Sequence, residues 1–179
     1  MRALLVVSVL IVMVGVASRG GAGQAGAVQA CSLLTADEIT GVTGAKAGEG
    51  RETATVLSSG PQKGETLAGW MWKLGEQGMV NVSVIRAATG AAREAGLAKL
   101  REGIEKLKSQ GWKQDRQTFG SVVCSTMTPP PSQKSMPIAV GCMGEAKGLG
   151  ISVGSMSPGS GVALPKIKAL FDKATSRLR

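Results

Sequence analysis

The feature that most constrains this chain is the apolar run close to its N-terminus. Arg2 precedes an apolar stretch that extends, with few interruptions, from Ala3 to Ala17. A charged start, a short apolar centre and a following small-residue segment are typical of a secretory signal peptide, and the run is too short and too poorly flanked to span a bilayer. We therefore expect residues 1–30 to be a signal peptide with its cleavage region, cut after Ala27 or Ala30, and residues 31–179 to be exported.

Length and charge limit the kind of domain that the exported part can form. Removal of 30 of the 179 residues leaves 149, which suits a single domain. Loss of Arg2 and Arg19 leaves 19 Lys plus Arg against 12 acidic residues, a net charge of +7. This surface should attract anions, although excess charge also simply keeps a secreted protein in solution. Nucleic acid is not an expected partner, because three Trp and two Phe are too few for a stacking platform and no nucleic-acid motif is present.

The first half of the exported chain alternates helical and strand patterns. Thr35 and Glu38 have the spacing of a capping box, which predicts a short helix ending near Gly44. Residues 45–64 are rich in Gly, Ser and Thr without a period, and they predict a long surface connection or a weak edge hairpin. Two alternating segments, 70–74 and 79–86, predict a hairpin with one buried face.

A long helix should follow between Thr89 and Gly111, with an apolar stripe formed by Leu97, Leu100, Ile104 and Leu107. The second half predicts three strands, 119–126, 137–143 and 149–156, and a final helix with Pro165 in its first turn. The order α-β-β-α-β-β-β-α predicts an α+β fold, in which an antiparallel sheet is covered by amphipathic helices.

Three cysteines remain to be assigned. Cys124 and Cys142 lie in adjacent predicted strands, and an exported protein meets an oxidising environment, so we predict a disulfide between them. Its role should be structural, because the chain has no C-x-x-C spacing that would lower a thiolate pKa. Cys31 is left over and is either lipidated, free or paired with another molecule. Contact with a membrane is expected only in the first case.

The residues needed for common catalysis are absent. The chain contains no His and no Tyr, which excludes Ser-His-Asp and Cys-His machinery and the common zinc sites. Paired carboxylates can catalyse glycoside hydrolysis, but the acids here lie mostly on helix faces or in the Gly-rich connection. We therefore expect a protein that is not an enzyme and that holds no cofactor.

Two weaker patterns concern ligands. Trp70 and Trp72 could line a ligand pocket, although two Trp on one strand face are more often core residues, here beneath the long helix. Met127, Met136 and Met143 lie near the two cysteines in sequence, and thioethers can hold Cu(I) in exported proteins. Methionine is also a common filler of gaps in cores, and these three positions have no regular spacing.

The start of the exported chain carries a family resemblance. Cys31-Ser32-Leu33-Leu34-Thr35, followed by Glu38-Ile39 and Gly44, resembles the start of a group of uncharacterised secreted and lipoprotein domains of actinobacterial envelopes. Trp72, the pair Cys124 and Cys142, and the closing Arg177-Leu178 also match the layout of that group. The group tends to have a Cys-x-Trp strand, where this chain has Trp70 in place of the cysteine. A first disulfide that would join Cys31 to that strand therefore lacks its partner here.

The resemblance implies an extracytoplasmic α+β domain and transfers no catalytic residue. Taken with the export signal, the missing catalytic residues and the positive charge, it leads to one main hypothesis. We expect an envelope or secreted binding module that recognises an envelope protein, a peptide or an anionic polymer. The alternatives are a carrier of a small ligand or of Cu(I) and, least favoured, an enzyme that works without His. The sequence indicates neither the ligand nor the oligomeric state.

Overall fold

The computed structural model describes residues 29–60, 62–76, 78–159 and 161–178. The expected signal peptide falls, apart from Gln29 and Ala30, outside these residues. None of the helices in the described ranges combines the length and the apolar character that a membrane crossing requires.

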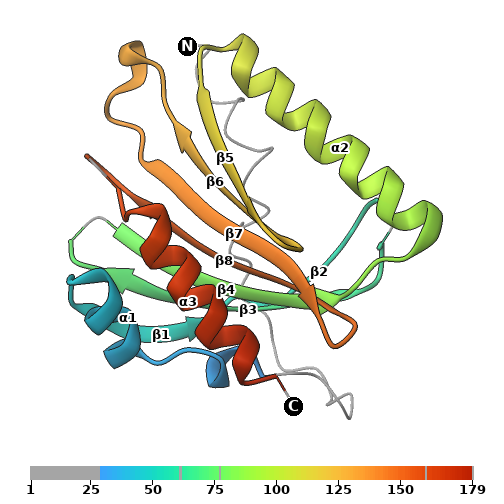
Figure 1. The fold of residues 1–179 in the computed structure, drawn as a ribbon, viewed down its shortest axis with the longest axis horizontal. Coiled ribbons are helices and arrows are strands. Elements are labelled where there is room, and N and C mark those ends of the chain that lie inside the picture. The colour runs from blue at the N-terminus through green and yellow to red at the C-terminus, as the bar shows by residue number, and fades with distance from the viewer. Residues whose placement is uncertain (1–28, 61, 77, 160, 179) are drawn as a thin grey trace.

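The described chain folds into one antiparallel sheet with three α-helices, which agrees with the α+β class expected from the sequence (Figure 1). The sheet has the strand order β1-β3-β4-β8-β7-β6-β5, and β2 pairs with β3 outside this path. In chain order the elements are the 3-10 turn η2 (Ala30–Ser32), α1 (Ala36–Thr43), β1 (Ala47–Glu52), β2 (Thr55–Val56), β3 (Thr66–Leu74), β4 (Gly78–Arg86), α2 (Gly90–Ser109), β5 (Lys113–Phe119), β6 (Val122–Thr128), the 3-10 turn η3 (Pro131–Gln133), β7 (Ile138–Ala146), β8 (Leu149–Ser157) and α3 (Leu164–Ser176).

The main core lies between one face of the sheet and the helices α1 and α3. In the central strands, Val82 of β4 is paired with Val153 of β8, which in turn is paired with Cys142 of β7, and all three are buried. The apolar stripe predicted for the last helix is buried against this face, since Ile167 and Leu170 are 0% exposed. Figure 1 shows α1 and α3 on the same side of the sheet, whereas α2 lies apart from them.

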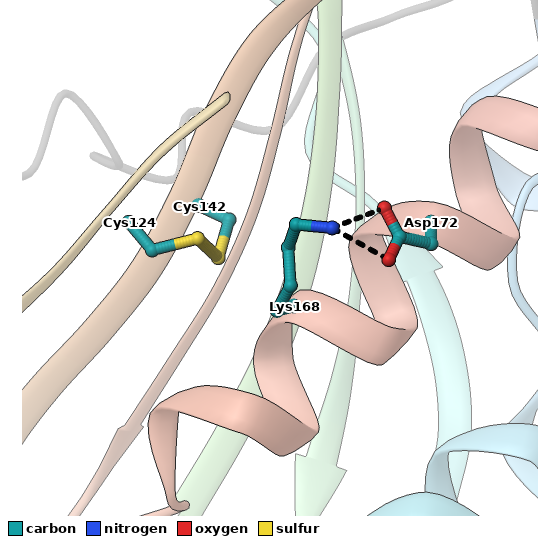
Figure 2. The surroundings of a disulfide bond; sticks show 4 residues. All are labelled: Cys124, Cys142, Lys168 and Asp172. Carbon is teal, nitrogen blue, oxygen red and sulfur yellow. Dashed lines mark hydrogen bonds and ion pairs between the residues drawn. A yellow bond between two sulfur atoms is a disulfide. The ribbon is translucent and has the colours of Figure 1, made fainter. Parts of the chain in front are cut away.

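The predicted disulfide is present, and it joins two neighbouring strands on the covered face. Cys124 and Cys142 form a direct cross-strand pair between β6 and β7, and their sulfur atoms are bonded. Both cysteines are buried, at 0% and 1% exposure, and Figure 2 shows the bond beside α3. On that helix, Lys168 binds Asp172 at 2.6 Å and lies 5.4 Å from the centroid of the Phe119 ring. Lys168 therefore connects α3 to the last residue of β5.

An ion-pair cluster ties the start of α1 to the end of α3. Glu38 completes the predicted capping box, because its carboxylate accepts from the Thr35 N–H at 3.0 Å while the Thr35 hydroxyl accepts from the Glu38 N–H. The Arg177 guanidinium donates to both oxygens of the same carboxylate, at 2.8 and 2.6 Å, and to the Leu33 carbonyl at 3.2 Å. Lys173 adds a second cation, 3.8 Å from a Glu38 oxygen.

The groups around the Glu38 carboxyl lower its pKa. Burial of the carboxyl opposes its ionisation, but the N–H of Thr35 and the guanidinium of Arg177 outweigh burial and lower the pKa of Glu38. The carboxylate thus remains charged under mildly acidic conditions.

The strands at the sheet edges bear on two sequence expectations. For residues 45–64 the sequence leaves a surface connection or an edge hairpin open, and the structure forms β1 and β2 there, each paired with β3 rather than with the other. The strand β5 at residues 113–119 differs from the expectation, because the sequence pattern predicts no strand before Phe119. The strands β1 and β5 are the two edges of the sheet, and most of their side chains are exposed. A strand without a buried face need not alternate apolar and polar residues, so periodicity does not reveal it.

We predict that removal of the disulfide destabilises the domain. Replacing Cys124 and Cys142 together by Ala should lower the free energy of unfolding by about 3 kcal/mol, because an 18-residue separation is no longer constrained in the unfolded chain. Urea denaturation of the purified chain measures this loss. Cys31→Ser is the matched control, since Cys31 is exposed and unbonded, and it should change stability by less than about 0.5 kcal/mol. An equal loss in both variants would contradict the prediction.

We also predict that the contribution of Glu38 depends on pH. Glu38→Gln keeps an acceptor for the Thr35 N–H but removes the charge that Arg177 binds, and it should cost about 1 kcal/mol at neutral pH. A carboxylate with a lowered pKa stabilises the fold above its unfolded-state pKa, and this stabilisation is lost as the pH falls through its folded-state pKa. Urea unfolding at pH 7 and near pH 3 should therefore show the wild-type advantage only at pH 7.

The matched control for this pH experiment is Glu105→Gln, which removes an exposed ion pair with Lys108 on α2. It should have little effect at either pH, because exposed pairs contribute little. A loss for Glu38→Gln that is the same at both pH values would show that the charge of Glu38 is not what stabilises this junction.

Candidate functional site

The face of the sheet opposite the core is the candidate site, and we call it the open face. Because strand residues alternate between the two faces, its members are the residues next to the core positions on each strand. On the five strands from β3 to β6 the open face comprises Gly69, Met71, Lys73, Met79, Asn81, Ser83, Ile85, Gly150, Ser152, Gly154, Met156, Ala139, Gly141, Met143, Glu145, Val123, Ser125 and Met127.

The open face consists mainly of methionines and small residues. At its centre Asn81, Gly154, Gly141 and Ser125 follow one another across four strands in a single row. Small side chains leave little apolar area to bury against a helix, in contrast to the Val, Ile and Trp of the covered face. The large apolar side chains of the open face in the described structure are therefore mainly methionines. Among them Met143 is 46% exposed.

The helix α2 is attached to this side of the molecule near its ends. Arg93, in its first turn, forms an ion pair with Glu145 of the open face, with 3.3 Å between Nη1 and Oε1. At the other end Gly111 approaches Pro130 so closely that an added Cβ would lie 3.2 Å from the Pro130 ring. Leu107 and Met127 are both buried, yet neither belongs to the main core cluster.

The apolar stripe of α2 differs from the expectation. The sequence predicts that Leu97, Leu100, Ile104 and Leu107 are buried as one stripe, but Leu97 and Leu100 are 36% and 37% exposed. Ile104 is partly buried and Leu107 is buried, so the helix is covered only in its C-terminal part. The reason is that α2 is held at its two ends rather than packed along its length, so that its middle presents leucines to solvent.

The two candidate ligand residues Trp70 and Trp72 lie on the covered face. Trp72 is 3% exposed and belongs to the main core, and Trp70 is partly buried against it. A Cβ on Gly50 of β1 would overlap the indole nitrogen of Trp70 and lie 2.6 Å from that of Trp72, so the glycine makes room for both rings. The expectation that they lie beneath the long helix is wrong, because α2 does not pack on this face.

An open cavity of about 630 Å³ lies between the end of α1, the β3–β4 turn and the start of α3. Neither Trp lines it. Its polar lining includes Glu76, Ser157 and Lys166, and the Lys166 ammonium already donates to the Thr43 carbonyl at 2.8 Å. One carboxylate and one ammonium do not provide the pair of acids that glycoside hydrolysis requires.

The remaining candidates from the sequence are spread over the structure. Cys31 is exposed and unbonded in the turn η2. Met143 points to the face opposite its neighbour Cys142, and Met127 is likewise on the face opposite Cys124, so these methionines are not brought to the cysteines. Met136 lies in the loop before β7. Within the described ranges no three side chains of Cys, Asp or Glu are grouped as a metal site would need.

The sequence interpretation missed the open face. Its signal is present in the sequence, because Met71, Met79 and Met156 alternate with core residues on their strands. Pairing between the strands, which single-strand patterns do not provide, is what brings these positions together.

Comparison with known proteins places the fold. No family model matches the sequence, and no curated protein matches it either. Among solved structures, the chain is similar to the extracellular domain of PknH from Mycobacterium tuberculosis, with a TM-score of 0.53 and 13% sequence identity. The similarity covers 83% of this chain and 94% of that domain. At this identity the likeness shows a shared fold.

Proposed function

We propose that this chain is an exported, non-enzymatic binding module that contacts a protein or peptide partner through its open face. The observation that carries the proposal is the contrast between the two faces of one sheet. One face is sealed by α1 and α3, whereas the other presents methionines, and the leucines of α2 are exposed on the helix attached to it.

The chemistry of this surface favours an apolar segment of a polypeptide. Three of the five large apolar residues most exposed in the described structure are Met143, Leu97 and Leu100. Methionine is flexible and polarisable, and it recurs on surfaces that accept partners of varied shape. An anionic polymer would instead need a concentration of Lys and Arg, while the open face from β3 to β6 contains Lys73 and the acid Glu145.

Export is supported by three further observations. The N-terminal segment has the pattern of a signal peptide, a disulfide holds two core strands, and the fold is shared with the extracellular domain of PknH. That neighbour is the extracellular part of a larger protein, and a sensing or contact role outside the cell is consistent with a domain that lacks His and Tyr.

We predict that Met143 is central to partner binding. Peptides selected from a random display library on the chain that begins at residue 31 should bind wild type and lose at least about tenfold in affinity to Met143→Glu, equivalent to about 1.4 kcal/mol. Isothermal titration calorimetry with the selected peptides measures this change. The variant should fold normally, because the side chain is 46% exposed.

The matched control is Val56→Glu, which places the same charge on an exposed apolar position of β2, away from the open face. It should leave the affinity unchanged. Equal binding to Met143→Glu and wild type would overturn the proposed surface. Failure to select any peptide would overturn the choice of partner, and salt-sensitive retention on anionic polymers would then favour an anionic surface.

A further inference from the structure

Five of the six methionines in residues 31–179 lie on the open face. Sequence neighbours of these methionines point to the core-facing side of the sheet. Val80, for example, follows Met79 and is buried, and Ser155 precedes Met156 and is buried. The five are Met71, Met79, Met127, Met143 and Met156, and the sixth, Met136, is in a loop. Thioether sulfur is thus concentrated on one face of the sheet.

Three of these methionines are neighbours through the strand register. Met79 of β4 is paired directly with Met156 of β8, which places their Cβ atoms about 5 Å apart. Met71 of β3 is opposite Asn81, two residues beyond Met79, and is therefore its diagonal neighbour at about 7 Å. Each side chain has three rotatable bonds, so its sulfur can move by several ångströms from the strand. The three sulfur atoms can therefore converge above Met79.

The surroundings leave room for this convergence. The Asn81 side chain leans over β8, because its Oδ1 lies 3.1 Å from the position that a Cβ on Gly154 would take. It is thereby directed away from Met71, which lies on the other side of β4. All three methionines are half-buried rather than covered, so that an ion can reach them.

The donor set favours a soft monovalent ion. The open face of β3, β4 and β8 carries no carboxylate, and Lys73, which is paired with Met79, is a cation that offers no ligand atom, so the thioethers are the ligands to consider. Mg²⁺ and Ca²⁺ require several oxygen ligands, and Zn²⁺ is held by Cys, His or carboxylate. Thioethers select Cu(I) among the biological metals.

We propose that Met71, Met79 and Met156 form a binding site for Cu(I). The site differs from the group Met127, Met136 and Met143, whose proximity in sequence suggests a copper site that the fold does not assemble. It goes beyond the proposed binding of a polypeptide and does not depend on it, because it uses thioethers on β3, β4 and β8 rather than Met143 of β7.

The test is a Cu(I) titration of the chain that begins at residue 31, under anaerobic conditions and in competition with a chromophoric Cu(I) chelator. All variants carry Cys31→Ser, because an exposed thiol would bind the ion more tightly than a thioether. Cys124 and Cys142 are bonded to each other and the chain has no His, so thioethers remain as the soft ligands. We expect one Cu(I) per chain.

Two variants test where the ion binds. Met79→Leu conserves side-chain volume and removes the sulfur that is common to both neighbour pairs, so it should weaken Cu(I) binding by about tenfold or more. Met143→Leu, on the same face, is the matched control and should leave the affinity unchanged. Thermal unfolding without metal checks that both variants remain folded.

Absence of binding in competition with the chelator, or an equal loss of affinity in Met79→Leu and Met143→Leu, would overturn the copper site. Neither result bears on peptide capture, which Met143→Glu tests separately. Conversely, intact Cu(I) binding in a chain that selects no peptide would overturn the proposed partner and leave the metal site standing.

Discussion

The structure depends on the packing of α3 against β8, β7 and β6. On the covered face of the central strands β4, β8 and β7, most buried side chains are branched aliphatics or, in β7, the disulfide-bonded Cys142, and they form one core with Ile167, Leu170 and Phe171. An antiparallel sheet needs only one buried face to be stable, since the hydrophobic free energy is gained on that face. The other face of the same strands is released from packing, which explains how it can be rich in Met, Gly and Ser.

The contacts around the covered face keep α1, α3 and the sheet edge β5 in place. Glu38 joins the start of α1 to Arg177 after α3, and Lys168 reaches Phe119 at the edge strand β5. These are polar contacts at the rim of an apolar core, so each contributes little alone. Together they hold both helices on one side, and the open face and α2 are left for other interactions.

Much of the fold can be predicted from local patterns. The capping box at Thr35, the left-handed glycine at the end of α1, the β3–β4 hairpin and the stripe of α3 all have strong short-range signals. The edge strands β1 and β5 lack such signals, because few of their side chains are buried: Ala47 is the buried residue of β1, and β5 has none. The exposure of Leu97 and Leu100 also could not be predicted, since an amphipathic stripe indicates a helix but does not identify the surface that covers it.

The sequence by itself determined the chemical inventory: an apolar segment near the N-terminus, a cysteine pair in two predicted neighbouring strands, the absence of His and Tyr, and alternating strands around amphipathic helices. These follow from composition and from periods of two or about four residues, which are local properties of the chain. Only the tertiary structure decided which face of the sheet the helices cover and that Met71, Met79 and Met156 become neighbours. These outcomes depend on strand order and register between segments up to 85 residues apart, which the packing of the whole core selects.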